Sequence, residues 1–255
     1  MTHLIYDATF EGLLTAIFEA YERKIDHARI LKAGTELKDI FADSLTIISD
    51  PAKASRVWKG LKSKLSPPTT HNFYSCFLSE LPLMEDTMLT FARHVFLSVQ
   101  NIEKDFGHEA TLTIAKTGRM VHREKHRMEA FVRFQRWADD TYFAMVAPDY
   151  NVLPLIVTHF KNRYGDQRWI IYDQKRLYGI HYDPATTRVN EIEFNFTENV
   201  MSPSSKLLHP QEELYQVLWK DYFKHVDIAS RKNLKLHIRH VPLRYWKHLT
   251  EKQPR

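Results

Sequence analysis

The spacing of apolar residues predicts that the first part of the chain is mainly helical. A short apolar run, Leu4–Tyr6, predicts a strand or an extended lead into a helix, and Asp7 and Thr9 after it are N-cap candidates. The periodic run that follows consists of Phe10, Leu13, Leu14, Ile17, Phe18 and Tyr21 at helical spacing. Helical patterns return over roughly residues 52–65 and 84–103, and the two prolines of Ser66–Thr70 are expected to break any helix between them.

In the centre of the chain, short runs are rich in β-branched and aromatic residues. FVRFQRW and TYFAMVA flank Ala138–Asp140, which predicts a hairpin turn. A helix is expected from near Asn151 to Tyr164, and three further strand patterns, RWIIYD, RLYGIHYD and VNEIEFNF, come after it in quick succession. Because these connections are short, we expect an antiparallel sheet of about five strands with one helix covering a face.

The last segment predicts a helix and then a basic tail. Starting at Pro210, the helix is expected to bury Leu214, Val217, Leu218 and Phe223. The resulting fold class is α+β: a helical N-terminal part, a central antiparallel sheet of about five strands with a covering helix, and a helical basic C-terminus. We expect a single domain over residues 1–255, with a mainly helical region at 1–115, the sheet and its helix at 116–200, and the helical basic tail at 201–255.

Composition excludes several classes of site. The chain has 255 residues and an apolar content of 44%, which is typical of a folded globular protein. Its one cysteine, Cys76, cannot form an internal disulfide or a cluster of thiolates, and its apolar neighbours indicate a buried, inert thiol. The seven glycines are nowhere spaced as GxGxxG or GxxxxGK[ST], so the usual dinucleotide and P-loop motifs are absent. We expect no cofactor.

No stretch of the sequence approaches the about 20 apolar residues that a membrane-spanning helix needs. The first residues also lack the basic start and apolar run of a signal peptide. The protein is therefore expected in the cytoplasm, without a membrane partner.

The charge is segregated along the chain. Residues 116–136 hold seven basic and two acidic residues, a net charge of +5, and residues 220–255 hold ten and three, a net charge of +7. Since the whole chain carries +5, the rest carries −7. Two basic segments in an otherwise acidic chain predict a surface for a polyanion, although solvated helix faces would give the same pattern. Tyr245 and Trp246, between Arg244 and Lys247, add rings that can stack on unpaired bases or dock the last helix.

Three pairs of residues are weaker candidates for chemistry. His122 and His126 share a helical face with Glu129, but Arg123 takes the place where a zinc protease needs glutamate, and the basic neighbours would repel a dication, so no metal site is expected. His159 and Arg163 are also four residues apart. Asp173 and Asp183 end neighbouring strands and could converge as a carboxylate pair, although aspartate is also common in turns.

Several longer segments carry a family resemblance: YDATFEGLLTAIFEAYE near the start, HREKHRMEAFVRFQ and PDYNVLPLIVTHFKNRYGDQRWIIYD in the centre, then YGIHYD, and RHVPLRYWKHLTE near the end. In these the chain resembles a bacterial family associated with DNA repair or DNA metabolism. Members of that family accompany a radical-SAM protein linked to DNA modification or repair, and related domains are fused to uracil-DNA-glycosylase-like proteins. The matching positions here are His122, Arg123, His126, Arg127, Arg133, Pro154, His159, Phe160, Arg163, Asp173, Arg244, Tyr245 and Trp246.

The resemblance implies a DNA-binding protein that acts beside a radical-SAM iron–sulfur partner. With only Cys76, the chain itself cannot hold the three-cysteine cluster of that partner. The residues expected to contact nucleic acid are Arg119, Arg123, Lys125, Arg127, Arg133, Arg163, Arg244, Tyr245, Trp246 and Lys247. Two alternatives stay open: a DNA-processing enzyme of nuclease or glycosylase type that uses Asp173 with Asp183 or His122 with His126, and an adaptor that docks the radical-SAM enzyme.

Overall fold

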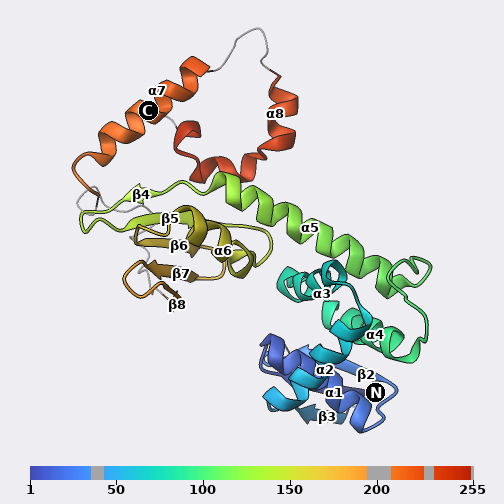
Figure 1. Ribbon diagram of the computed structural model, residues 1–255. Helices are drawn as coiled ribbons and strands as arrows, with labels where there is room; N and C mark the ends of the chain where they lie inside the picture. Colours follow the sequence, from blue (N-terminus) through green and yellow to red (C-terminus); the bar gives the residue numbers. More distant parts are fainter. Residues whose placement is uncertain (36–42, 194–207, 227–232, 254–255) are drawn as a thin grey trace. The chain divides into compact units, whose positions relative to one another are not determined.

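The structure, a computed structural model, describes residues 1–35, 43–193, 208–226 and 233–253. It divides into two compact units, Met1–His122 (unit 1) and Arg123–Arg255 (unit 2), shown in Figure 1. Helix α5 (Glu109–Phe131) begins in unit 1 and ends in unit 2. No helix in the described parts of the chain is both long enough and apolar enough to cross a membrane.

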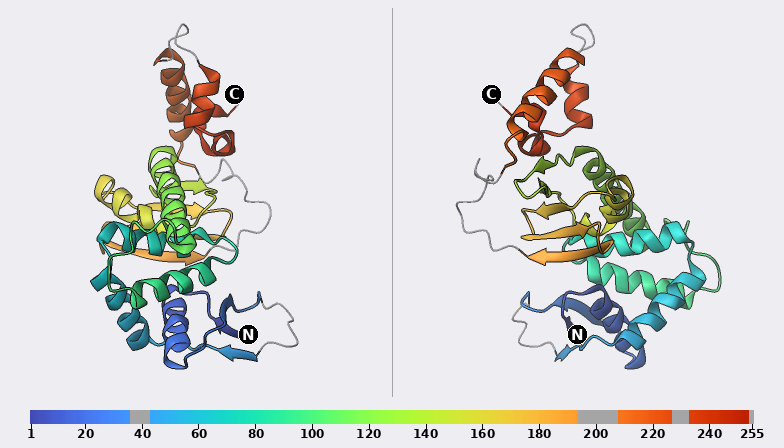
Figure 2. Two further views of the ribbon diagram at one scale, coloured as in Figure 1. Left: turned by 90° about the vertical axis from the view of Figure 1, so that its right-hand side faces the viewer. Right: turned by 60° about the vertical axis from the view of Figure 1, so that its left-hand side comes forward.

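Unit 1 contains a three-stranded sheet, of which the sequence pattern indicated only the first strand, as a strand or extended lead over Leu4–Tyr6. Strands β1 (Thr2–Tyr6), β2 (Ala28–Lys32) and β3 (Asp43–Thr46) are all parallel, in the order β2-β1-β3. Helix α1 (Phe10–Glu22) forms the crossover from β1 to β2 and packs against the sheet (Figure 2). It begins at the predicted N-cap Thr9, whose side chain accepts a hydrogen bond from the Gly12 amide.

The helices of unit 1 largely confirm the predicted pattern. They are α2 (Pro51–Lys64), α3 (Pro67–Ser79), α4 (Met84–Leu97) and the first part of α5. The Ser66–Thr70 segment does mark the end of α2, but Pro67 and Pro68 then start α3. The reason is that proline fits the first turn of a helix, where its missing N–H would have no partner.

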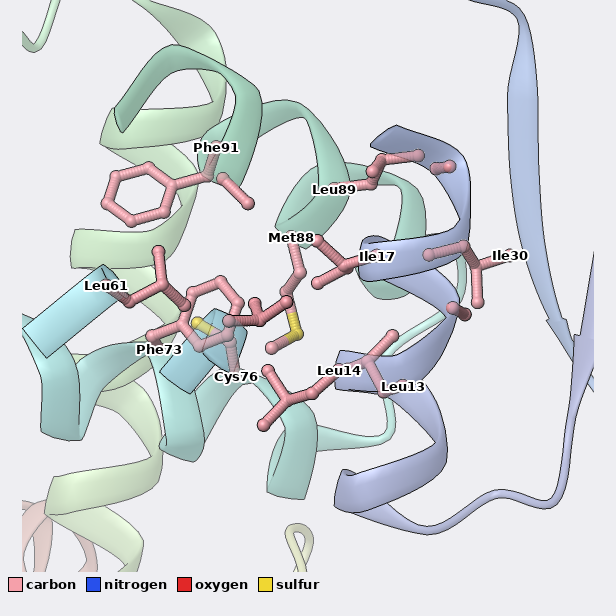
Figure 3. Close-up of a cluster of buried hydrophobic side chains, with 14 of the residues drawn as sticks. Leu13, Leu14, Ile17, Ile30, Leu61, Phe73, Cys76, Met88, Leu89 and Phe91 are labelled. Carbon is pink, nitrogen blue, oxygen red and sulfur yellow. The ribbon is translucent and has the colours of Figure 1, made fainter. Parts of the chain in front are cut away.

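A continuous apolar core fills unit 1 (Figure 3). It joins Leu13, Leu14 and Ile17 of α1 with Ile30 of β2, Leu61 of α2, Phe73 and Cys76 of α3, and Met88, Leu89 and Phe91 of α4. Cys76 is fully buried, and burial raises the pKa of its thiol to about 12. The prediction of a buried thiol is thereby confirmed.

The five-stranded sheet of unit 2 runs in the order β4-β5-β6-β7-β8. Its strands are β4 (Gln135–Arg136), β5 (Tyr142–Val146), β6 (Trp169–Asp173), β7 (Tyr178–Asp183) and β8 (Arg188–Glu193). The α+β class and the number of strands are confirmed. The sheet is mixed, however, because β5 and β6 are parallel and helix α6 (Leu153–Arg163) crosses between them. The prediction of an antiparallel sheet was wrong at this pair, since the predicted helix is itself a crossover.

The remaining helices of unit 2 are α7 (Glu212–Val226), α8 (Leu234–His240) and the two 3-10 helices η2 (Leu243–His248) and η3 (Thr250–Lys252). The helical C-terminus is thus confirmed. The predicted burial along α7 is not, because Leu214, Val217 and Leu218 are each more than half exposed. Phe194 and Phe196 of the predicted third strand pattern lie outside the described residues.

Candidate functional site

Unit 2 contains an open cleft of about 1050 Å³ at the end of α5. We call it the aromatic cleft and define it by residues from α5, the chain after it, β5, α6 and α7. They are Glu129, Arg133, Phe134, Tyr142, His159, Arg163, Tyr164, Tyr215, Trp219 and Tyr222. Polar groups come mainly from α5 and α6, and exposed rings come from α7, so the cleft combines two kinds of surface.

Helical spacing positions the polar side. On α5, Met128 is buried, which leaves Glu129, one residue further along, on the cleft side. Directly after the helix ends, Val132 is buried and Arg133 lines the cleft in the same way. On α6, Ile156 and Phe160 are buried, and His159 and Arg163 lie on the adjacent face. The sequence identified His126 with Glu129 and His159 with Arg163 as separate pairs, and the fold brings Glu129 and His159 together.

Glu129 is the centre of a small charged cluster. Its Oε1 atom lies 2.9 Å from Lys125 Nζ and 4.0 Å from His159 Nδ1, and its Oε2 atom lies 3.8 Å from His126 Nδ1. The Glu129 side chain is only 15% exposed, whereas that of His159 is 36% exposed and that of His126 is 81% exposed. A carboxylate beside an imidazole that reaches solvent is a combination that can move a proton.

The three arginines of the cleft differ in how they are engaged. Arg133 pairs with Glu251 at 2.8 Å and also lies over the Trp219 ring, and Arg136 of β4, which also lines the cleft, pairs with Asp140 at 2.7 Å. Arg163 is exposed, contacts the Tyr164 hydroxyl and ring, and has no acidic partner among the described residues. Arg163 is therefore the guanidinium of the cleft that is most available to an anionic ligand.

Helix α7 supplies a row of rings, and the helix is anchored at its start and at the middle ring of the row. Buried Glu212 accepts a hydrogen bond from the Arg136 amide, and Trp219 Nε1 donates to Glu251 at 3.0 Å. Burial acts to raise the pKa of Glu251, but hydrogen bonds from Arg133 and Trp219 outweigh it and lower that pKa. Tyr215, Trp219 and Tyr222 are nonetheless 52%, 39% and 59% exposed, and the last two rings stack on each other.

The sequence contained the signal for this row, because the three rings recur every three or four residues. The apolar pattern of the same helix had indicated a core position instead. Periodicity shows which residues share a face of a helix, and it does not show whether another element covers that face.

Around Arg244 and Tyr245, the tail does not present the predicted stacking surface. Glu124 of α5 is buried and accepts hydrogen bonds from Arg244, from the Tyr245 hydroxyl and from the Asp149 amide. Tyr245 is 2% exposed, and its pKa is raised by burial and by Glu124. Its ring has no free face for a base. Both residues fix the tail to α5.

The next two predicted contact residues differ in exposure. Trp246 is half-buried, donates to the Val241 carbonyl and has Lys252 over its ring, while Lys247 is exposed. Only Lys247 is therefore fully open to a ligand.

The remaining basic residues predicted to bind nucleic acid lie on α5. Arg119 in unit 1 and Arg123 in unit 2 are exposed. Arg127 lies 3.8 Å from Glu124, and Lys125 is paired with Glu129. Among the residues that the structure describes, no group of three or more His, Cys, Asp or Glu side chains could hold a metal ion.

The predicted carboxylate pair does not form. Asp173 pairs with Tyr178 in the β6–β7 ladder, and Asp183 lies five residues further along β7. The two strands are antiparallel, so the carboxylates lie at opposite ends of the ladder, on the order of 15 Å apart. Asp173 is fully buried against Arg176 at 2.8 Å, and burial raises its pKa in spite of that ion pair. Asp183 accepts from the Ala185 amide in the following turn.

Comparison with protein families gives one match. The model of DUF4130, a domain of unknown function, matches residues 82–251, which is about two thirds of the chain and includes every residue of the aromatic cleft. A comparison with curated proteins finds no match.

Proposed function

We propose that this chain, which belongs to the DUF4130 family of domains of unknown function, is a nucleic-acid-binding protein that holds an unpaired stretch of strand in the aromatic cleft. The observation that carries the proposal is the row of exposed rings on α7 beside the acid-free Arg163. Bases of any sequence can stack on exposed aromatic rings once they are unpaired, and a guanidinium can hold the phosphate between them.

The distribution of charge supports the same location. Unit 1 has 14 basic and 15 acidic residues, a net charge of −1, whereas unit 2 has 22 and 16, a net charge of +6. Neutralisation of phosphates by lysine and arginine supplies most of the sequence-independent affinity for nucleic acid. Unit 2, which contains the cleft, therefore carries the excess of positive charge.

The finer parts of the proposal come from the family resemblance of the sequence. They are that the strand is DNA, that the setting is repair or metabolism of DNA in the cytoplasm, and that a radical-SAM iron–sulfur protein is a partner. Stacking on exposed rings requires bases that are already unpaired or that leave the duplex, and both occur on damaged DNA.

Fluorescence anisotropy with labelled single-stranded and duplex DNA of one sequence, measured across a salt series, tests the proposal. We expect single strands to bind more tightly and the affinity to fall steeply as salt rises. Replacing Tyr215 and Tyr222 by Ala should weaken single-strand binding roughly 10-fold or more, since each stacked base contributes about 1–3 kcal/mol. Phe106→Ala, which removes an exposed ring in unit 1, is the matched control. Equal affinity of the double variant and the wild type would contradict the proposal.

A second function, docking of a protein partner, is favoured by one observation. Leu214 and Val217 of α7 are 57% and 58% exposed and do not line the cleft. Apolar side chains grouped on one helix are typical of a protein interface. The same titration separates the two functions, because an adaptor would not bind DNA even at low salt.

A further inference from the structure

The cleft also contains the side chains that RNA cleavage requires. Glu129 and His159 approach to 4.0 Å from two different helices, and Arg163 lies one turn beyond His159 on α6. A carboxylate can act as the general base and an imidazole as the general acid, and a guanidinium can bind the phosphate. The three side chains all line the same cleft.

The two nitrogens of the His159 ring have different surroundings. The Nδ1 atom lies 4.0 Å from Glu129 Oε1, and the Nε2 atom makes no hydrogen bond among the described residues. Lys125 beside Glu129 adds a second cation close to the same point. Histidine can exist in both protonation states near neutral pH, so it can supply a proton there.

We propose that the aromatic cleft cleaves single-stranded RNA by internal transesterification, with Glu129 as base, His159 as acid and Arg163 on the phosphate. This inference rests on the proposed binding function. Glu129 accepts the proton of a ribose 2′-hydroxyl as its oxygen attacks the adjacent phosphorus. The bond from phosphorus to the 5′-oxygen breaks, and the protonated His159 gives its proton to that oxygen. The products are a 2′,3′-cyclic phosphate and a 5′-hydroxyl.

The chemistry of the cluster favours this substrate class. RNA carries its own nucleophile, so a base, an acid and a cation complete the step without any co-reactant. The attacking and leaving oxygens lie on opposite sides of one phosphorus atom in an in-line displacement, so the base and the acid have to approach it from two sides, and Glu129 and His159 come from two different helices. DNA lacks the 2′-hydroxyl and should be bound without being cleaved.

The test uses the full chain with an unstructured RNA, the same sequence as DNA, and the RNA carrying 2′-O-methyl groups, all in the presence of a chelator. Mass spectrometry should detect 2′,3′-cyclic phosphate ends from the RNA alone. The rate should fall towards both acid and alkaline pH, as expected for one base and one acid. Anisotropy on the DNA and on the 2′-O-methyl RNA measures binding separately from cleavage.

The variants separate the inferred activity from a contaminating nuclease and from misfolding. Glu129→Gln and His159→Asn should each lose about 100-fold or more of the cleavage rate while their DNA affinity changes less than a few-fold. His240→Asn, purified in the same way, alters an exposed histidine outside the cleft and should cleave like the wild type.

The ways in which the test can fail are distinguishable. RNA that is bound but stays intact, or that is cleaved equally by His159→Asn, overturns the inferred activity and leaves the binding function standing. If neither DNA nor RNA binds, the proposed function fails, and the activity in this cleft fails with it.

Discussion

The two units distribute their apolar side chains in opposite ways. In unit 1 the exposed ones, such as Ile48, Leu83 and Phe106, are scattered around a continuous core. In unit 2, by contrast, six large apolar or aromatic side chains between Leu214 and Tyr222 are exposed on the single helix α7. Scattered exposure is normal on any protein, whereas exposure concentrated on one element marks an interaction surface. The difference is what the proposed function builds on, because it places the concentrated exposed surface in unit 2.

Buried carboxylates fix the residues around the cleft of unit 2. Around the cleft, buried carboxylates act as fixed anchors: Glu124 holds Arg244 and Tyr245, Glu251 holds Arg133 and Trp219, and Glu212 holds the start of α7. Such contacts fix geometry more than they add stability, since burying a charge is costly. The surroundings of the cleft in unit 2 are therefore fixed by directional bonds, in addition to the apolar packing that both units have.

The largest effect on stability is expected from the core of unit 1. Phe73 is fully buried, and Phe73→Ala should lower the free energy of unfolding by about 3–5 kcal/mol through lost burial and a cavity. Guanidinium denaturation, followed by circular dichroism, measures this loss of unfolding free energy. The exposed Phe106→Ala in the same unit should change stability by less than about 0.5 kcal/mol. Similar losses in both variants would contradict the view that packing holds unit 1.

Removing a buried carboxylate that anchors the tail of unit 2 should lower the free energy of unfolding by less than Phe73→Ala does. Glu124→Ala leaves the buried Tyr245 hydroxyl without its acceptor, while Arg244 keeps its ion pair with Asp149. We expect a loss of about 2 kcal/mol, because solvent around Arg244 also screens part of the ion pair that is lost. Glu213→Ala, at an exposed glutamate of α7, is the control. An unchanged denaturation midpoint in Glu124→Ala would show that the anchor has no structural role.

Acidification should affect the two units over different pH ranges. Burial, with a smaller effect of Lys247, lowers the pKa of His248 in unit 2 from 6.5 to about 4. In unit 1, burial opposes the shift of Glu103, but hydrogen bonds from Ser66 and Thr69 lower its pKa from 4.5 to about 2. A lowered pKa in the folded state gives stability that is present above the unfolded value and is lost as pH falls through the folded one.

The contribution of His248 is therefore lost between about pH 6.5 and 4, and that of Glu103 between about pH 4.5 and 2. Thermal unfolding at stepped pH should show a shallower fall of Tm from pH 6.5 to 4 in His248→Leu than in the wild type. Parallel curves over that range would rule out the assigned role of His248.

The smallest effect on stability is expected at the ligand-binding face. Arg163 is exposed and has no acidic partner among the described residues, so Arg163→Gln should shift the free energy of unfolding by less than about 0.5 kcal/mol. Single-strand affinity should nevertheless fall several-fold and its salt dependence should become shallower, because one phosphate contact is lost. A loss of stability without a loss of affinity would place Arg163 among the anchors instead.

Local pattern alone determined much of the secondary structure of this protein. Periodicity located α1, α2, α4 and α6, Thr9 marked the first helix start, and alternation located β7 and most of β8. These features depend on residues a few positions apart, so they can be read from the chain directly. Strands β2 and β3 of unit 1 and the parallel pairing of β5 with β6 escaped prediction because pairing depends on partners distant in the sequence.

Only the tertiary structure decided which chemistry-bearing residues meet. Glu129 and His159 lie 30 residues apart and converge because α5 and α6 each bury their own apolar face. Antiparallel pairing of β6 and β7 separates the candidates Asp173 and Asp183, which are ten residues apart in the sequence. Tyr245 is buried, and its hydroxyl donates a hydrogen bond to Glu124. The sequence by itself determined the α+β class, the positive charge and the residue types available for binding, because these depend on local and additive properties. Exposure and convergence depend on which elements cover one another, and that is settled only when the chain packs.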